Sequence, residues 1–198
     1  MSNQYFENNE NLKSNIHTIK YYFKKTTLVF DTDNGVFSKG GIDFGSNVLL
    51  QSLPIFEEKL TLLDVGCGYG TIGLTIAKKY PNIIVDMVDV NLRAIELAKS
   101  NALKNDINNV NIFESSCYEN VDKMYDVIIS NPPIRAGKKI VFEILSGAYE
   151  HLNMGGELYI VIQKKQGAES SLKHLKTIFE NVEVINKDGG YWIIKSRK

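Results

Sequence analysis

Short apolar runs alternate with longer amphipathic stretches along most of this chain. The run from Leu60 to Val65 is apolar, has the length of a strand and is followed by glycines, so it predicts a buried strand. Residues 71–79 come next, with the spacing of a helix. The same alternation continues to the end of the chain, which is typical of a sheet with helices on both faces.

Seven strands and four helices are expected from this alternation. The strands are predicted at 61–65, 83–88, 110–113, 125–129, 157–162, 182–186 and 191–195, and the helices at 71–79, 92–104, 138–151 and 170–180. Only residues 187–190 separate the last two strands, which leaves no room for a crossover helix, so these strands must run antiparallel. The sequence predicts a doubly wound, mostly parallel α/β sheet that ends in an antiparallel hairpin.

A different pattern precedes this series. Residues 15–23 and 26–30 are strand-like and predict a hairpin, and Asp33-Asn34-Gly35 is a strong turn signal. Residues 36–38 are expected to form another short extended piece. Because these pieces fall outside the strand order of the main sheet, they predict a small N-terminal hairpin that can serve as a lid.

A short helix is expected at 47–53, with Ser46 as its N-cap and Pro54 at its end. The chain has 198 residues with 43% hydrophobic content, which suits one sizeable core better than two. We therefore expect a single domain over 1–198, in which an extension at about 12–55 precedes a cofactor-binding catalytic core at 58–198.

Composition narrows the partners that the chain can have. The 23 basic and 23 acidic residues cancel, so no overall field draws the protein to nucleic acid or to an anionic membrane. The polar N-terminus and the strand-length apolar runs predict a soluble, cytoplasmic protein that does not contact a membrane. Cys67 and Cys117 lack metal-type spacing and the three histidines are scattered, so no metal site is expected.

Three glycines at alternate positions, Gly66, Gly68 and Gly70, follow the first strand of the main series. They let the backbone turn sharply and approach a ligand that faces the N-terminus of the next helix. In one register, Gly68, Gly70 and Gly73 match the dinucleotide fingerprint. In the other, Asp64 stands ahead of the glycines, where its carboxylate would repel a pyrophosphate and hold an ammonium group. A tight turn without a ligand is the plain alternative.

The second register resembles the first motif of the Rossmann-like S-adenosylmethionine-dependent methyltransferases. In that family the loop wraps the methionine end of the cofactor, and an acid at the end of the next strand binds both ribose hydroxyls. Asp89 occupies that position, although it or Asn91 can also cap the following helix. After the third strand the resemblance implies adenine contacts from Ser116 and Cys117, where many relatives carry an aspartate; an ordinary polar loop is the alternative. The resemblance implies cofactor contacts by Asp64, Gly66, Cys67, Gly68, Gly70, Asp89, Val90, Ser116, Cys117 and Asn131.

The tetrapeptide Asn131-Pro132-Pro133-Ile134 follows the fourth strand and carries the expected chemistry. An exocyclic amine on an aromatic base is a poor nucleophile because its lone pair is delocalised. The Asn131 side-chain oxygen and the Pro132 carbonyl can each accept one N–H and aim the lone pair at a methyl donor. The two prolines hold this turn rigid.

This tetrapeptide resembles the Asn/Asp-Pro-Pro-aromatic motif of amino-group methyltransferases, with Ile134 in place of the aromatic residue. DNA adenine methylation is therefore not favoured. Phe37, Phe44 or Tyr118 can offer a stacking face instead, although core packing is the commoner role of such residues. From about Val36 to its end the chain resembles the catalytic half of the bacterial ribosomal small-subunit guanine-N2 methyltransferases, without their extra N-terminal domain. That resemblance is carried by 35–38, 41–46, the glycine loop and 131–138.

The resemblance implies a methyltransferase that acts on an exocyclic amino group, guanine N2 of ribosomal RNA, in free RNA or a ribosomal particle. Phe37, Arg135 and Lys138 are expected to bind the substrate, the last two through phosphates, with plainly solvated side chains as the alternative. A protein glutamine N-methyltransferase and a catalytically silent ribosome-assembly factor are the competing interpretations. The oligomeric state is left open between monomer and dimer.

Overall fold

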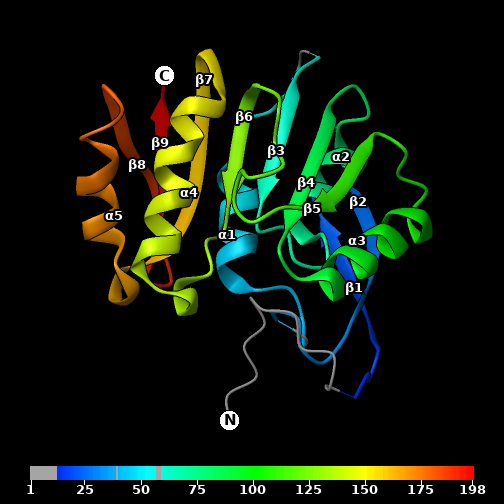
Figure 1. Ribbon diagram of the computed structural model, residues 1–198. Helices are drawn as coiled ribbons and strands as arrows, with labels where there is room; N and C mark the ends of the chain where they lie inside the picture. The colour runs from blue at the N-terminus through cyan, green and yellow to red at the C-terminus, as the bar shows by residue number, and fades with distance from the viewer. Residues whose placement is uncertain (1–12, 39, 57–58) are drawn as a thin grey trace.

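A seven-stranded sheet runs through the molecule, of which a computed structural model describes residues 13–38, 40–56 and 59–198 (Figure 1). The strands are β3 (Thr61–Val65), β4 (Ile84–Asp89), β5 (Val110–Glu114), β6 (Tyr125–Ser130), β7 (Leu152–Gln163), β8 (Asn181–Asp188) and β9 (Tyr191–Arg197). They stand in the order β5-β4-β3-β6-β7-β9-β8. Strands β3 to β7 run parallel to one another, whereas β9 runs antiparallel to both of its neighbours. The predicted mostly parallel sheet with an antiparallel C-terminal hairpin is confirmed.

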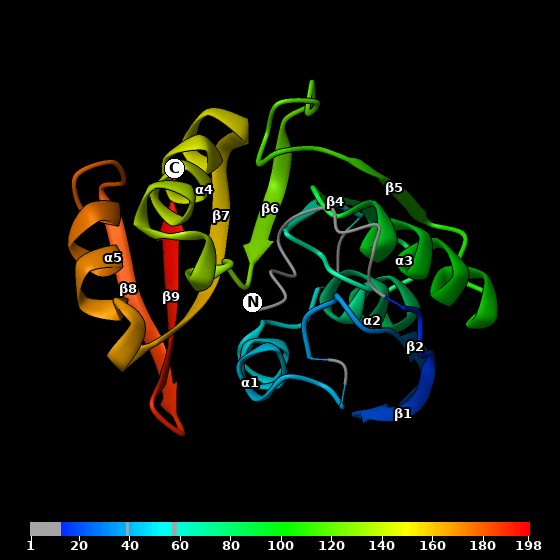
Figure 2. The same ribbon diagram turned by 60° about the horizontal axis from the view of Figure 1, so that its bottom comes forward.

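Helices cover both faces of this sheet (Figure 2). The helices are α1 (Phe44–Ser52), α2 (Thr71–Lys79), α3 (Leu92–Lys104), α4 (Lys138–His151) and α5 (Ala168–Leu175). One hydrophobic cluster joins the sheet to α1, α2 and α3, and the other joins it to α4 and α5. Leu62 and Ile129 belong to the first cluster, and their sequence neighbours Leu63 and Ile128 belong to the second. The strands read as continuous apolar runs because both of their faces are buried.

Two element boundaries differ from the expectation by five residues, which is more than any other boundary does. Strand β7 begins at Leu152, directly after α4, instead of at 157. Helix α5 ends at Leu175 instead of at 180, because tighter bonds follow it: Ile178 N donates to the Leu175 carbonyl at 3.0 Å. Phe179 is then buried in the core. Periodicity alone does not show where a helix tightens and turns inward.

The expected N-terminal hairpin is present as β1 (His17–Phe23) and β2 (Thr26–Thr32). Two asparagine side chains, one in α3 and one at its C-cap, bond to the backbone of β2 on the edge that β1 does not pair with. Asn105 exchanges two hydrogen bonds with the backbone of Val29, at 2.8 and 2.7 Å, and Asn101 does the same with Asp31, at 2.7 and 2.9 Å. Asn101 also donates to the Tyr69 carbonyl in the glycine loop at 2.9 Å. Hairpin, helix and loop are therefore fastened to one another.

The connection between the hairpin and α1 departs from the prediction. Residues 36–38 form turns and not an extended piece, and Ser38 has a left-handed φ of 56°. The N-cap of α1 is Asp43 and not Ser46, because the Asp43 carboxylate accepts a hydrogen bond from the Ser46 backbone N–H at 2.9 Å. Aspartate and serine are both good capping residues, and the prediction considered only Ser46, three positions after the observed cap. Among the helices described, none is long and apolar enough to cross a bilayer.

Candidate functional site

A cavity of about 300 Å³ opens where the carboxyl ends of β3, β4 and β6 meet, toward the lower edge of the sheet in Figure 1. Its walls come from the glycine loop after β3, the end of β4, the loop after β5, the turn after β6 and the first half of α4. Strand order reverses at β3, which is where open α/β sheets bind their ligands. This cavity is the candidate site.

The glycine loop has the conformation that its composition predicts. Gly66, Gly68 and Gly70 have φ angles of 75°, 57° and 100°, in the region that favours glycine. The backbone N–H groups of Gly66 and Cys67 both donate to the Val88 carbonyl, at 2.8 and 2.9 Å, so the loop is tied to the end of β4. Gly66, Cys67 and Gly68 line the cavity. Gly70 does not line it; Gly70 begins α2, and a Cβ there would lie 2.6 Å from Leu74.

Asp64 lies behind this loop. Its side chain is buried, and one carboxylate oxygen accepts a hydrogen bond from Gly73 N at 2.8 Å. The other oxygen, Oδ1, is buried with no hydrogen-bond partner. Burial, with a smaller contribution from the Asp89 charge, raises the pKa of Asp64 to about 7. Asp64 does not line the cavity, but an unpartnered buried acceptor behind the loop suits a cationic ligand group on the loop's other side.

Asp89 lies at the end of β4 and lines the cavity. Its two oxygens accept hydrogen bonds from Gly68 N at 2.8 Å and from Asn91 N at 2.9 Å. Burial raises its pKa, while the backbone N–H groups oppose that shift. Each oxygen keeps further acceptor capacity, so the carboxylate can take two adjacent hydroxyls. Asn91 is the cap of α3, since its side chain accepts from Arg93 N and Ala94 N, and the helix does not need Asp89 as its cap.

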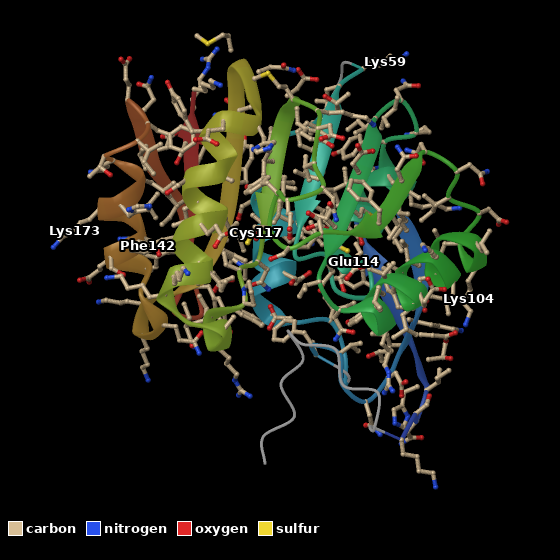
Figure 3. The ribbon with its side chains drawn as sticks, viewed as in Figure 1. Lys59, Lys104, Glu114, Cys117, Phe142 and Lys173 are labelled. Atoms are coloured by element: carbon tan, nitrogen blue, oxygen red, sulfur yellow. The ribbon has the colours of Figure 1, made fainter. Side chains whose placement is uncertain are left out.

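The loop after β5 forms the next part of the wall. Ser115, Ser116 and Cys117 all line the cavity. Ser115 shapes the loop: its hydroxyl donates to the Cys117 carbonyl at 3.1 Å and accepts from Asn120 N at 3.0 Å. Cys117, labelled in Figure 3, is half-buried with a left-handed φ of 49°.

Both cysteines at the cavity are held as thiols. Burial, followed by the nearby Glu143 carboxylate, raises the pKa of Cys117 to about 11. Burial also raises the pKa of Cys67, and the Asp89 and Asp64 charges act in the same direction. A protonated thiol is a poor nucleophile, so these residues fit the role of small wall residues better than a reactive one.

The turn after β6 presents Asn131 to the cavity. Ser130 ends the strand, and its hydroxyl donates to the Val65 carbonyl at 2.7 Å, which ties the turn to the base of the glycine loop. The Asn131 side-chain nitrogen donates to Asp43 Oδ2 at 3.0 Å and to Ser46 Oγ at 2.9 Å. Pro132 and Pro133 line the cavity beside it.

Besides Asp64 and Gly70, three more residues of the expected site do not line the cavity. Ile134 begins a 3-10 turn, η1 (Ile134–Ala136), and packs against the hydrophobic cluster on the α4 side. Arg135 is exposed. Lys138 Nζ lies 4.8 Å from the ring centroid of Phe142, which is labelled in Figure 3 and stacks on His174 at 4.0 Å. Lys138 is therefore engaged on the outer side of α4.

Of the three aromatic residues considered for stacking, Phe37 alone lines the cavity. Phe44 packs against Tyr191, with ring centroids 5.7 Å apart. The Tyr118 side chain is buried, and its hydroxyl donates to the Ile144 carbonyl at 2.9 Å. Within the ranges described, no three His, Cys, Asp or Glu side chains converge as metal ligands would.

Several lining residues were not anticipated. Three of them lie in the glycine loop or the first turn of α2: Tyr69, Thr71 and Ile72. The glycine spacing that predicted this loop says nothing about the side chains between and after the glycines. Ile140 and Ile144 are four residues apart on α4, a spacing that reads as ordinary core. The remaining additions are Ser46, Val65, Ala94, Ser115 and Ala136. Ser46 is the informative omission, because no local pattern connects it with Asn131.

Comparisons with known proteins show the family to which the chain belongs. Residues 27–195 match the model of the methyltransferase small domain family. The chain is 46% identical over 200 residues to the uncharacterised protein YbxB of Bacillus subtilis (strain 168), covering the whole of both chains. It is 35% identical over 170 residues to ribosomal RNA small subunit methyltransferase C of Aeromonas hydrophila, covering 82% of this chain and 47% of that protein. It thus spans about half the length of these ribosomal RNA methyltransferases.

The fold has a solved counterpart in a T. thermophilus 16S rRNA N2 methyltransferase, in complex with AdoMet and guanosine. The TM-score is 0.84 at 22% sequence identity, and the match covers 92% of this chain and 50% of that one. At this identity the likeness shows the fold. The family match covers most of the sequence, and so does the 35% identity. The chain therefore belongs to the methyltransferase small domain family, and the expectation of an S-adenosylmethionine-dependent methyltransferase is confirmed.

Proposed function

We propose that this enzyme transfers a methyl group to N2 of guanine in ribosomal RNA. The observation that carries the proposal is Asn131, whose two amide hydrogens are taken by Asp43 and Ser46. Its oxygen is thus the end left to accept a hydrogen bond, as an exocyclic amino group requires. The similarity to ribosomal RNA small subunit methyltransferase C favours an amino group in RNA over amino groups in other molecules. Such a substrate implies a cytoplasmic location.

The residues around the cavity fit S-adenosylmethionine in two places. The unpartnered Oδ1 of Asp64 suits the ammonium group of its amino acid end, and the two oxygens of Asp89 suit the ribose hydroxyls. Ser116 and Cys117 line the same cavity, and we assign them to the adenine. When bound, the cofactor supplies an electrophilic methyl group on a positively charged sulfur.

Catalysis then rests on alignment. The Asn131 oxygen and the Pro132 carbonyl each accept a hydrogen bond from one N–H group of the substrate amine. These two bonds localise the nitrogen lone pair and aim it at the methyl carbon. Ser130 and the two prolines keep both acceptors in place before the substrate arrives. The nitrogen becomes cationic as the C–N bond forms, and its proton is then lost to water. No strong base is needed in this scheme.

The substrate base would enter beside Phe37, which lines the cavity and is 38% exposed. Ile134 is partly buried against the hydrophobic cluster on the α4 side, so Phe37 is the stacking surface that we assign to the base. Arg135 directly follows the catalytic turn and is free to meet a phosphate near the flipped base. Lys138 contributes less in this scheme, because it lies over Phe142.

A labelling experiment tests the proposal. Ribosomal RNA, ribosomal subunits and total protein from a strain that lacks the gene are incubated with methyl-labelled S-adenosylmethionine and the enzyme. We expect label in RNA, recovered as N2-methylguanosine after digestion, and none with Asn131→Ala. Label in protein as methylated glutamine would contradict the proposal and favour the second enzyme class. Cofactor binding without transfer to any fraction would favour a silent assembly factor.

A further inference from the structure

We propose that Asp43, with Ser46, is a positioning residue that sets which end of the Asn131 amide faces the substrate. This inference rests on the proposed function of Asn131 and adds residues from the N-terminal part of the chain to the catalytic turn. Asp43 Oδ2 accepts from the Asn131 side-chain nitrogen at 3.0 Å, and Ser46 Oγ accepts from the same nitrogen at 2.9 Å. Asp43 and Ser46 would act through Asn131, without touching the reacting atoms.

The chemistry of a carboxylate explains the orientation. An asparagine amide has a donor end and an acceptor end of nearly equal shape, so it can turn by half a revolution at little steric cost. An ionised carboxylate only accepts hydrogen bonds, and the amide oxygen cannot face it without repulsion. The Asn131 nitrogen must therefore point to Asp43. Among the described residues its oxygen has no hydrogen-bond partner, which leaves that oxygen available to the substrate.

Asp43 also changes the quality of the acceptor. A hydrogen bond from an amide N–H to a charged oxygen is stronger than one to a neutral oxygen, and it polarises the amide toward its own oxygen. The Asn131 oxygen then accepts more strongly from an N–H bond whose nitrogen is becoming positive. The negative charge of Asp43 lies on the far side of the same amide and favours that developing charge.

The fold holds Asp43 in place from three sides. As the N-cap of α1, its Oδ2 also accepts the Ser46 N–H at 2.9 Å, so one oxygen serves both the helix and the catalytic turn. The preceding segment is tied to the glycine loop, because the Tyr69 hydroxyl donates to the Gly41 carbonyl at 3.3 Å. Gly45 fits closely beside Asp43: a Cβ there would lie 2.8 Å from the Tyr191 ring and 3.0 Å from Asp43 Oδ2. The carboxylate therefore has little room to move.

Asp43→Asn separates the catalytic role from the structural one. Asparagine is about as good an N-cap as aspartate, so α1 stays capped and the melting temperature stays near that of the wild type. The oxygen that caps α1 can still accept from the Asn131 nitrogen, but the new amide carries no charge, so the charge-assisted bond that fixes and polarises the Asn131 amide is lost. We expect kcat to fall by about tenfold to a hundredfold, with KM for S-adenosylmethionine unchanged within about twofold. Ser46→Ala should show a smaller loss of the same kind.

A double-mutant cycle tests whether Asp43 acts through Asn131. In the Asn131→Ala background, Asp43→Asn should lower kcat by less than about threefold further. Asp106→Asn is the matched control, because Asp106 is an exposed aspartate after α3 with a left-handed φ of 53°, which asparagine tolerates. A loss from Asp43→Asn that is equally large with and without Asn131 would overturn the inference, as would wild-type kcat in Asp43→Asn.

A second readout does not depend on turnover. In protein labelled with ¹⁵N, the side-chain amide of Asn131 is identified as the signal lost in Asn131→Ala, and its two protons should exchange slowly with water. In Asp43→Asn that exchange should quicken by more than about tenfold, since the charge-assisted bond is gone. If wild-type enzyme transferred no methyl group to RNA, the proposed function would fail, and this measurement would still decide the orientation. Unchanged exchange in Asp43→Asn would refute it.

Discussion

The two walls of the cavity are built in different ways. We call the side assigned to the cofactor, from the glycine loop to the end of β4, the cofactor wall. It is made of segments that follow one another in the chain, since Gly68 and Asp89, whose N and Oδ2 are hydrogen-bonded, are 21 positions apart. The acceptor wall brings Asn131 together with Asp43 and Ser46 across 88 and 85 positions. The first wall works mainly through backbone N–H groups and φ angles, and the second through side chains from distant segments. If the proposed function is right, binding of the donor and aiming of the acceptor have separable determinants.

The largest expected effect separates the two walls. Asn131→Ala should lower kcat by about a hundredfold to a thousandfold, because the amine is no longer aligned. Its dissociation constant for S-adenosylmethionine should stay within about twofold of the wild type. Asp89→Ala should do the reverse, weakening cofactor binding by about tenfold to a hundredfold with most of kcat retained at saturation. Single-turnover rates and calorimetry measure the two quantities; a variant that lost both together would break the comparison.

Asn101→Ala should weaken the cofactor wall from behind. Asn101 is fully buried and bonds both Asp31 in the hairpin and the Tyr69 carbonyl. Its removal leaves buried backbone groups unpaired, so the free energy of unfolding should fall by about 2–3 kcal/mol. Asn105→Ala, which leaves the Tyr69 bond in place, should cost less. Urea unfolding measures both variants, and an equal loss in the two would show that the bond to the glycine loop contributes nothing.

The pKa of Asp64 predicts how cofactor binding depends on pH. Because its folded pKa is raised to about 7, the carboxyl is neutral below that pH and cannot attract an ammonium group. Affinity for S-adenosylmethionine should fall by up to about tenfold per pH unit below 7. In the cofactor-free protein the sign is opposite: the folded state holds this proton more tightly than the unfolded state, so its contribution to stability is lost as pH rises from about 4 to 7. Calorimetry between pH 5.5 and 7.5 checks the first statement; a profile unchanged in Asp64→Asn would contradict it.

The smallest expected effect concerns the rim of the acceptor wall. Arg135→Ala should raise KM for the RNA substrate by about threefold to tenfold and reduce the salt dependence of binding, as loss of one phosphate contact does. Lys138→Ala should change KM by less than about twofold, because Lys138 lies over Phe142. Filter binding at several salt concentrations compares the pair. Equal effects would mean that Lys138 leaves Phe142 when RNA binds.

The sequence allowed part of the cofactor wall to be predicted, although Asp64 and Gly70 do not line the cavity and Tyr69, Thr71 and Ile72 were missed. Gly66, Gly68 and Asp89 line the cavity where their order along the chain had placed them, because a strand, a tight turn and a helix fix their positions locally. The acceptor wall was predicted at Asn131 and the two prolines and missed at Ser46. The expectation that Arg135 and Lys138 would join the site followed their neighbourhood in sequence, but η1 and α4 turn them away from the cavity.

Periodicity and glycine spacing by themselves determined the alternation of strands and helices and the tight turn after β3, because each depends on residues close together in the chain. The Asn-Pro-Pro turn indicated the class of chemistry through its resemblance to amino-group methyltransferases. The tertiary structure alone decided that Asp43 caps α1 and at the same time holds the Asn131 amide. It also decided that Ile134 packs against the hydrophobic cluster while Phe37 lines the cavity. Contacts across more than eighty positions leave no periodic trace in a sequence. They form only when the start of α1 and the turn after β6 meet at the same edge of the sheet.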